Sequence, residues 1–414
     1  MNTATVPNTA LSAELSELLS VVEPASVADV LLERAFGHRA TDIHLDPTSA
    51  GTRVRYRIDG ELQDILPIPS QAAASVISRI KVMAELDITE KRMPQDGHIS
   101  SRRFDGLDRD IRVSSLPTVH GERLVLRLMP DPSEFSVLAD LGFLPKQLES
   151  VETFLKMPYG LLLVVGPVGS GKSTTLYSLL RELNVTQRSL VTIEDPVERL
   201  LPGANQVQVD ARTGLGFATA LRAVLRQDPN IMAIGEIRDA ETAAIACRAA
   251  MTGVLVLSTL HASTAASAIE VLKQYGVPKL VISEALRGVI SQRLIRRISI
   301  KDREDYIPED DLVRRYDLEH GVPIARGIPT DRNFNTGYEG RVAVFENLQA
   351  SSAIRDAVDR GATADELTEI ARREGMATLR ESAQQLVREK ITSVHELQRI
   401  IVDTDASAGT QPLS

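Results

Sequence analysis

The feature that most constrains the fold of this chain is the glycine-rich segment GPVGSGKST at residues 166–174. It fits the pattern G-x-x-x-x-G-K-[ST], whose backbone N–H groups can enclose a phosphate at the N-terminus of a helix. The apolar run GLLLVVG precedes it, and TTLYSLLREL, a segment with helical composition, follows it. A strand before and a helix after are the context that the pattern requires, so a chance glycine-rich turn is the less favoured interpretation. The segment predicts an α/β domain with a phosphate-binding loop.

The side chains of this loop indicate which phosphate compound and which metal ion it binds. Lys172 is expected to reach the β- and γ-phosphates of a nucleotide, and the hydroxyl of Ser173 is expected to bind Mg²⁺. ATP and Mg²⁺ are therefore the predicted ligands. The residues expected to contact the nucleotide in this loop are Gly166, Pro167, Val168, Gly169, Ser170, Gly171, Lys172, Ser173 and Thr174.

Three further apolar runs each stop at polar residues. They are LVTI before Glu194-Asp195, IMAI before Gly235-Glu236, and VLVLST before Leu260-His261. Apolar strands alternating with helices indicate a largely parallel sheet buried on both faces, which binds its ligand at the carboxyl ends of the strands. There Glu194 or Asp195 could orient the attacking water of phosphoryl transfer, and His261 could sense the γ-phosphate. The alternatives are a solvated turn for the acids and a structural hydrogen bond for the histidine.

The segment IMAIGEIRD, residues 231–239, raises a separate question. Many phosphate-handling ATPases end such a strand on a metal-holding Asp, whereas this chain has Gly235 followed by Glu236. Mg²⁺ bound to a nucleotide keeps several waters, so one fewer protein ligand does not destroy the site. We expect Glu236 at the metal or its water shell and Glu194 nearer the water, and either could be the base.

Composition excludes several classes of protein. The net charge of −9 over 414 residues gives no reason to expect nucleic-acid binding. Cys247, the single cysteine, excludes an intramolecular disulfide and any site built from several thiolates, and it suits a reducing compartment. No run approaches about 18 apolar residues, and the N-terminus lacks the features of a secretory signal. We expect a cytoplasmic protein without direct membrane insertion, which reaches a membrane only through partners.

Composition also divides the chain into segments. The first folded segment should be a small α+β domain, in which Asp59-Gly60 predicts a hairpin turn because such turns need positive φ. The charged arm has little apolar content over 298–336, so it is expected to be exposed. The predicted segments are a flexible leader (1–24), the α+β domain (25–130), a linker (131–142), the ATPase core (143–297), the arm (298–345), a helical region (346–403) and a disordered tail (404–414).

Several arginines of the first domain occupy alternate positions of one expected strand. Arg53, Arg55 and Arg57 alternate with apolar residues on one expected strand, and Arg112 lies on a later one. The pattern alone favours a solvated charged face. The alternative is that some of these guanidinium groups reach the nucleotide and stabilise the charge of the transition state.

The motifs taken together resemble the secretion-superfamily ATPases of type II secretion and type IV pilus assembly, with the type II secretion branch nearest. The resemblance spans about residues 27–402 and rests on long blocks in the family's order. Among these blocks are RYRIDGEL, RIKVMAELDITEKRMPQDGHIS, IRVSSLPTVHGERLVLRLM, GPVGSGKSTTLYSLL, TIEDPVE, LRAVLRQDPNIMAIGEIRDAETA, TGVLVLSTLHAS and GYEGRVAVFE. It implies a homohexamer of subunits with a PAS-like N-terminal domain and a RecA-like ATPase domain. It also implies inner-membrane platform and docking proteins as partners, at the cytoplasmic face.

The resemblance also implies roles for particular residues. TIEDPVE matches the family's Asp box, GEIRD its Walker B block and STLH its His box, which implies catalytic roles for Glu194, Glu236 and His261 and a nucleotide contact for Asp195. Arg57 and Arg112 match the family's nucleotide-facing arginines, so Arg53 and Arg55 keep the solvated interpretation. Ser173 and Glu236 are the implied metal ligands.

Three departures from the family pattern shape the expectations. The stretch 298–336 has no cysteine and one histidine, His320, so no zinc module of the usual thiolate kind is expected. About 25 residues before the first domain are too few for the family's N-terminal docking domain, so docking uses another surface or the natural protein is longer. The His box reads TLHAST, without the family's usual Asn and Asp.

Three alternatives to an assembly ATPase remain. They are a nucleotide-gated regulatory subunit with weak turnover, a pilus retraction motor and a small-molecule kinase.

Overall fold

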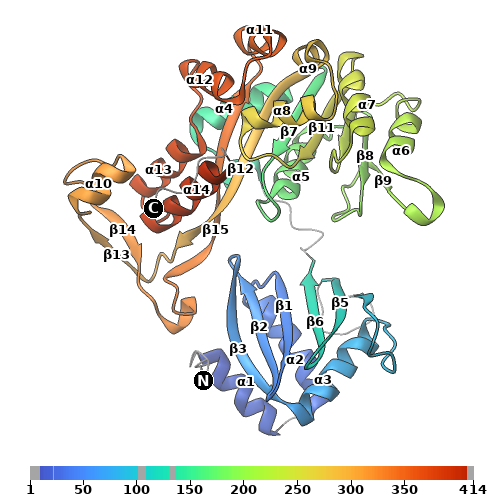
Figure 1. The fold of residues 1–414 in the computed structure, drawn as a ribbon, viewed down its shortest axis with the longest axis vertical. Coiled ribbons are helices and arrows are strands. Elements are labelled where there is room, and N and C mark those ends of the chain that lie inside the picture. The colour runs from blue at the N-terminus through green and yellow to red at the C-terminus, as the bar shows by residue number, and fades with distance from the viewer. Residues whose placement is uncertain (1–9, 22, 101–108, 130–136, 408–414) are drawn as a thin grey trace. The chain divides into compact units, whose positions relative to one another are not determined.

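The computed structural model describes residues 10–21, 23–100, 109–129 and 137–407, which form two compact units (Figure 1). Unit 1 combines the N-terminal part of the chain with two segments of the predicted arm, and unit 2 contains the rest. The division assigns Met1–Glu134, Ser299–Arg303 and Gly327–Gly340 to unit 1, and Phe135–Ile298, Glu304–Arg326 and Arg341–Ser414 to unit 2.

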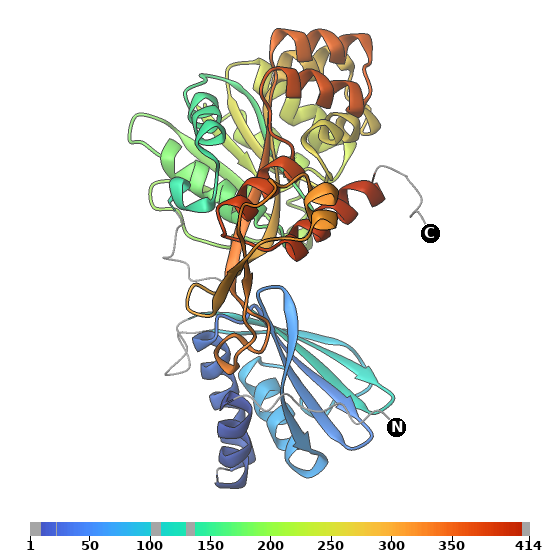
Figure 2. The ribbon, with the colours of Figure 1, turned by 90° about the vertical axis from the view of Figure 1, so that its left-hand side faces the viewer.

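Unit 1 is an antiparallel sheet covered on one face by helices, as Figure 2 shows. The sheet has six strands in the order β3-β2-β1-β6-β5-β4. Alternate residues such as Val54 and Tyr56 are buried against the helices, and the residues between them face away. The elements are α1 (Ala10–Val21), α2 (Pro24–Gly37), β1 (Asp42–Thr48), β2 (Gly51–Ile58), β3 (Glu61–Pro69), α3 (Ser70–Met83), β4 (Gln95–Ile99), β5 (Ile111–Thr118) and β6 (Gly121–Leu128).

Two local features of unit 1 can be compared with the sequence-based expectations. Asp59 and Gly60 have φ of 50° and 90°, and Ile58 pairs with Glu61, so the predicted hairpin turn is present. The leader differs from its prediction, because helix α1 buries Leu11 and Leu15 in the core of unit 1. These leucines are one helical turn apart and therefore share a face, which gives this segment an apolar stripe to bury. Residues 1–9 of the predicted leader lie outside the described residues.

The arginine stripe of β2 is an array of ion pairs. Arg55 Nη2 lies 2.6 Å from Asp46 Oδ2, and Arg53 pairs with Asp64 through two hydrogen bonds. Arg123 on β6 contacts the second oxygen of Asp46 at 2.7 Å. Arg53 and Arg55 thus lie on a charged face, and acids on neighbouring strands pair with both side chains, which are 42% and 22% exposed.

Unit 2 is built on a sheet of seven strands in the order β15-β12-β7-β11-β10-β8-β9. The pairings β12–β7, β7–β11, β11–β10, β10–β8 and β8–β9 are all parallel. Leu161 and Leu163 of β7 pack into one hydrophobic cluster and Leu162 into another, so helices cover both faces of the sheet. The strands are β7 (Gly160–Val165), β8 (Leu190–Glu194), β9 (Asn205–Gln208), β10 (Ile231–Ile234), β11 (Leu255–Leu260), β12 (Leu286–Ile298) and β15 (Tyr338–Gln349). The predicted α/β class with a largely parallel sheet is confirmed.

The helices of unit 2 divide between the two faces of the sheet and a C-terminal group. One cluster joins the sheet to α6–α9, and the other joins it to α4 and α5. The helices and short 3-10 turns of this part are η2 (Leu138–Leu141), α4 (Pro145–Leu155), α5 (Lys172–Leu183), η3 (Ala211–Thr213), α6 (Phe217–Val224), α7 (Ala240–Met251), α8 (Ala265–Gln274) and α9 (Lys279–Ala285). Of the predicted linker, residues 131–136 lie outside the described residues and η2 occupies most of the rest.

The C-terminal region is helical, as expected. Thr363 and Thr378 form capping boxes with Glu366 and Glu381. The helices are α11 (Ser352–Arg360), α12 (Ala364–Arg373), α13 (Leu379–Arg388) and α14 (Val394–Ser407). Helix α14 thus extends into the predicted disordered tail, of which residues 408–414 lie outside the described residues.

The charged arm contains regular structure and a buried cluster, which differs from the exposed segment expected. It comprises β13 (Arg303–Tyr306), α10 (Asp310–Tyr316), β14 (Ile324–Gly327) and η4 (Asp331–Asn333). Val313, Tyr316 and Ile324 are buried in one cluster with residues of α13 and α14. The expectation was wrong because a few apolar residues spread along a charged sequence can share one face, and α13 and α14 supply the rest of the cluster.

A buried ion pair ties α14 to β12. The Glu396 carboxylate is 1% exposed, and it accepts hydrogen bonds from Arg296 Nη2 at 2.7 Å and from the Arg296 backbone N–H at 2.8 Å. Burial acts to raise the pKa of Glu396, but the hydrogen bonds and charge of Arg296 outweigh it, so the pKa lies below its usual range. The carboxylate is therefore charged and paired inside the protein.

We expect Glu396→Ala to lower the free energy of unfolding by about 3–5 kcal/mol, because it leaves the buried Arg296 guanidinium without its partner. Denaturant titration followed by circular dichroism measures this loss. Glu369→Ala is the matched control, since Glu369 pairs with Arg373 at 3.1 Å on an exposed helix surface. Exposed pairs of this kind contribute little. Equal losses for the two variants would contradict the prediction.

Candidate nucleotide-binding site

Four neighbouring strands of unit 2 end at one edge of the sheet. Their registers pair Leu260 with Val165, Ser258 with Ile234, and Ile234 with Ile193. These parallel strands are β7, β11, β10 and β8, which run into the glycine-rich loop, His261, Glu236 and Glu194 respectively. The structure therefore brings together the strand-end residues that the sequence singled out in this unit.

The glycine-rich loop has a backbone that larger residues could not adopt. Gly169 and Gly171 have φ of 77° and 87°, and a Cβ on Gly166 would lie 2.5 Å from the carbonyl oxygen of Gln292. Helix α5 begins at Lys172, so the loop lies at a helix N-terminus, where backbone N–H groups and the helix dipole favour an anion. A narrow backbone loop of this kind fits a phosphate chain.

Lys172 lies across this loop. Its Nζ donates hydrogen bonds to the carbonyl oxygens of Gly166 and Pro167, both at 2.9 Å. Burial lowers the pKa of Lys172, and the negative charge of Glu236 acts in the opposite direction. An ammonium group bound to its own loop can exchange these carbonyl oxygens for phosphate oxygens, and Ser173 follows it at the start of the helix. The loop, this amine and the hydroxyl of Ser173 together suit a nucleotide with its Mg²⁺.

Glu236 is in direct contact with the predicted histidine. Its Oε1 lies 2.7 Å from His261 Nε2, and its Oε2 accepts a hydrogen bond of 2.7 Å from Arg238 Nε. The Arg238 guanidinium also lies 3.6 Å from a carboxylate oxygen of Asp195. Residues from three different strand ends therefore form one chain of polar contacts, Asp195–Arg238–Glu236–His261. Sequence reasoning missed Arg238, although the acid–x–Arg spacing of Glu236 and Arg238 in GEIRD was a usable signal.

Gly235 has a packing reason in this arrangement. Its N–H donates to the Ile193 carbonyl at 2.8 Å, which continues the pairing of β10 with β8. A Cβ at this position would lie 3.3 Å from the carbonyl oxygen of Ile193 and 3.4 Å from the Cα of Glu194, so a side chain here would pack closely against the end of β8. Gly235 continues the pairing of the two strands without a side chain, and the first carboxylate of this strand end is that of Glu236.

Glu194 lies in a buried network of hydrogen bonds. Its carboxylate accepts from the hydroxyls of Tyr177 and Thr192 and, at 3.0 Å, from Gln206 Nε2. Burial and the neighbouring Glu194 raise the pKa of Tyr177, so its phenol stays protonated and donates. Both oxygens of Glu194 therefore carry structural bonds that join α5, β8 and β9. Its predicted action on the attacking water stays a prediction.

The remaining predicted site residues are placed as follows. Arg57 and Arg112 lie in unit 1, where Arg57 Nε is 3.5 Å from Asp42 Oδ2 and Arg112 pairs with His98 in the sheet register. Their reach to the nucleotide stays a prediction. Within the described part of the chain, no group of three or more His, Cys, Asp or Glu residues could hold a metal ion, so the metal prediction rests on Ser173 and Glu236.

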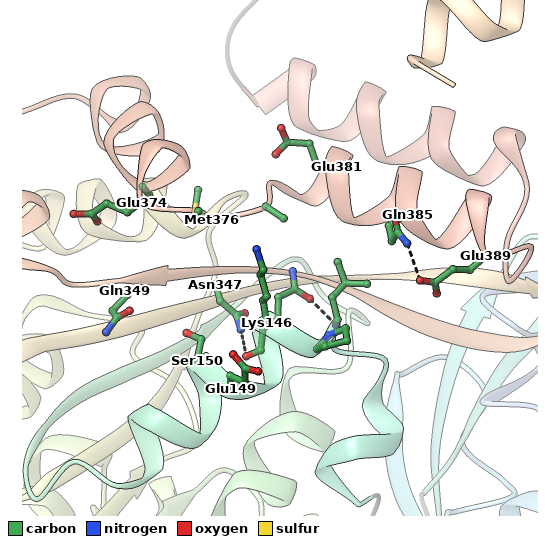
Figure 3. Close-up of a pocket in the computed structure, with 16 residues that line it drawn as sticks. Lys146, Glu149, Ser150, Asn347, Gln349, Glu374, Met376, Glu381, Gln385 and Glu389 are labelled. Carbon is green, nitrogen blue, oxygen red and sulfur yellow. Dashed lines mark hydrogen bonds between the residues drawn. The ribbon is translucent and has the colours of Figure 1, made fainter. Parts of the chain in front are cut away.

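Unit 2 also contains a cavity of about 820 Å³ between α4, β15 and the residues around α13 (Figure 3). Lys146, Glu149, Asn347 and Glu389 are among the residues that line it. None of the predicted nucleotide-site residues lies on its wall. The cavity is therefore separate from the strand-end site.

Comparison with known proteins agrees with the site. The family model described as "Type II/IV secretion system protein" matches residues 19–399. The chain belongs to this family. The resemblance stated from the motifs is thereby confirmed.

Individual members of the type II/IV secretion system protein family match most of the chain. The chain is 44% identical over 371 residues to the "Type IV pilus assembly ATPase PilB" of Thermus thermophilus, covering 89% of this chain and 42% of that protein. It is 42% identical over 393 residues to the "Type II secretion system protein HxcR" of Pseudomonas aeruginosa, covering 94% of this chain and 80% of the relative. The chain thus spans less than half of the Thermus protein.

A solved structure supports the fold. The crystal structure of the pilus retraction motor PilT with bound ADP matches with a TM-score of 0.61 and 26% identity, covering 90% of this chain and 96% of that one. The predicted RecA-like class of the ATPase domain is confirmed by this likeness. Among the described residues, no helix is both long and apolar enough to cross a membrane.

Proposed function

We propose that this chain is a hexameric motor ATPase that hydrolyses MgATP to drive the assembly of pilin-like subunits in type II secretion or a related type IV pilus system. The observation that carries the proposal is the meeting of Lys172 with the Glu236–His261 pair at the ends of neighbouring parallel strands. Phosphoryl transfer to water uses a lysine that binds the phosphates and a residue that orients the attacking water, and the Glu236 carboxylate can take the second role.

Each residue has a distinct task in this reaction. The loop amides, Lys172 and Ser173 hold the phosphate chain and its Mg²⁺, which together supply the phosphoryl group and neutralise its charge. Glu236 polarises the attacking water, because its carboxylate contacts the side chains of His261 and Arg238, which are 49% and 55% exposed. These partly solvated contacts can be exchanged for a water. Glu194 instead links β8 to α5, so we propose Glu236 and not Glu194 as the base.

The coupling to subunit assembly rests on the relatives. A pilus assembly ATPase and a type II secretion protein match at 44% and 42% identity, whereas the retraction motor matches at 26%. These values favour assembly over retraction. We therefore propose inner-membrane platform and docking proteins as partners and the cytoplasmic face of that membrane as the place of action. Arg57 and Arg112 are proposed to contact the nucleotide from unit 1, and no zinc is required in the arm.

Phosphate release from ATP by the full chain tests the proposal. We expect Mg²⁺-dependent turnover without any added acceptor, together with hexamers in mass photometry when a non-hydrolysable ATP analogue is present. EDTA is the control and should stop turnover. Turnover that appears only with a small-molecule acceptor would identify a kinase. Tight binding of the analogue without turnover, in a hexamer supplied with its membrane partner, would identify a regulatory subunit.

A further inference from the structure

Glu346 on β15 is a buried carboxylate to which no role has yet been given. Its side chain lies among residues of unit 2, and the residue is 3% exposed. Oε1 accepts a hydrogen bond of 2.7 Å from the backbone N–H of Ala265, and Oε2 accepts one of 3.2 Å from the backbone N–H of Leu379. Each oxygen thus binds a different helix.

Both of these N–H groups are first-turn donors of a helix. Ala265 is the first residue of α8 and Leu379 the first residue of α13. The preceding residues, Thr264 and Thr378, cap the same helices by accepting from donors deeper in the first turn. The N–H of the first residue is left without a partner inside its helix. One carboxyl group therefore satisfies two helix N-termini. Burial raises the pKa of Glu346, and the hydrogen bonds from the two helix N-termini act in the opposite direction.

Helix α8 starts four residues after His261. Four residues, 261–264, connect the end of β11 to α8, and His261 at their start contacts Glu236 at 2.7 Å. Arg293 Nη2 donates to the Ser263 carbonyl at 2.7 Å. The connection is thus held by the sheet at one end, by Arg293 near its middle and by Glu346 at its other end. With so few residues between these points, a shift of the α8 N-terminus must move His261.

We propose that Glu346 is a positioning residue, which holds the 261–264 connection so that the His261 imidazole meets the Glu236 carboxylate. This inference rests on the proposed function, since it gives a role in hydrolysis to a residue outside the nucleotide site. Glu346 also fixes α13 at the same point, so the C-terminal helices and the histidine share one anchor. A shift of α13 would therefore change the position of His261 relative to Glu236.

The conservative substitution Glu346→Gln removes one bond of this anchor. Both neighbours of the carboxylate are backbone donors, and a glutamine offers one acceptor oxygen and one donor amide. One of the two N–H groups must then face an NH₂ group and lose its hydrogen bond. The volume is unchanged, so the effect arises from the lost contact and not from a cavity.

A double-mutant cycle with His261→Ala tests the role. We expect Glu346→Gln to lower kcat about 10–100-fold, the size of effect that small misplacements of a catalytic group produce. KM should stay within about twofold, because the phosphate loop is untouched. Adding Glu346→Gln to His261→Ala should cause little further loss, since the histidine through which Glu346 acts is already gone. Phosphate release measures kcat for the unmodified full chain, the two single variants and the double variant.

The controls separate positioning from stability. Glu396→Gln alters another buried carboxylate of the same unit and should leave kcat unchanged at a temperature where calorimetry shows every variant folded. Thr264→Ala removes the side-chain cap of α8 and is the second variant if Glu346→Gln does not fold. It too should lower kcat. In the His261→Ala background it should cause little further loss of kcat. Losses that multiply in the double mutants, or a His261→Ala variant with unchanged kcat, would overturn the positioning role. Absence of Mg²⁺-dependent turnover in the unmodified chain would overturn the proposed function as well.

Discussion

Lys172→Ala should abolish ATP hydrolysis. The Lys172 ammonium group lies across the glycine-rich loop, bound at 2.9 Å to two carbonyl oxygens of that loop. This ammonium group places a positive charge beside the loop amides that are proposed to bind the phosphates. Losing one contact that stabilises developing charge typically costs roughly 10²–10³ in kcat, and this lysine also contributes to ground-state binding. We therefore expect turnover at the level of the buffer blank.

The measurement is phosphate release over a range of ATP concentrations. Lys146→Ala is the matched control, because Lys146 is a lysine of the same unit on the wall of the separate cavity. It should keep the turnover of the unmodified chain. Calorimetry should show that both variants unfold near the same temperature. A Lys172→Ala variant with the turnover of the unmodified chain would show that the phosphates are bound elsewhere and would remove the basis of the proposed function.

The parts of this site that follow backbone rules could be predicted from the sequence. A strand, a glycine-rich loop and a helix follow from GPVGSGKST, and parallel strands bring their ends to one edge of the sheet. For this reason the order of motifs along the chain is enough to predict that Lys172, Glu236 and His261 gather at one edge. Their meeting needs only the strand order, which neighbouring βαβ units restrict to a few possibilities.

The side-chain partners of the site could not be predicted in this way. The bonds of Glu194 to Tyr177 and Gln206 join residues of three elements, and such contacts depend on how far each strand extends past its neighbour. Arg238 could have been suggested by its spacing from Glu236, but its contact with Asp195 required the β10–β8 register. The roles of the two glutamates therefore separate only when their surroundings are compared.

The arm shows a different limit of sequence reasoning. Counting charges over residues 298–336 indicated an exposed segment, yet Val313 and Tyr316 are buried against α13 and α14. The apolar partners come from a region some 70 residues later in the chain, so local composition could not reveal them. The same holds for helix α1, whose leucines become core residues only when the sheet of unit 1 is present.

Glu236→Gln should bind ATP and hydrolyse it slowly. Glutamine keeps the shape of the side chain and can still accept from His261 or Arg238, but it cannot polarise a water as a carboxylate does. We expect kcat to fall by roughly 10²–10³, the loss seen when a single group that stabilises the transition state is removed. Binding of a fluorescent ATP analogue should change little, because Lys172 and the loop remain.

Glu194→Gln is the informative comparison, because the two glutamates differ mainly in their surroundings. Glu194 accepts from Tyr177, Thr192 and Gln206, so an amide at this position places a donor against donors. Its main effect should be a lower unfolding temperature, because a buried donor is left without an acceptor. If Glu194→Gln is stable and binds ATP but hydrolyses it slowly, while Glu236→Gln keeps normal turnover, then Glu194 is the base and Glu236 has the structural role. If Glu236→Gln alone gives that result, the carboxylate after Gly235 is the base.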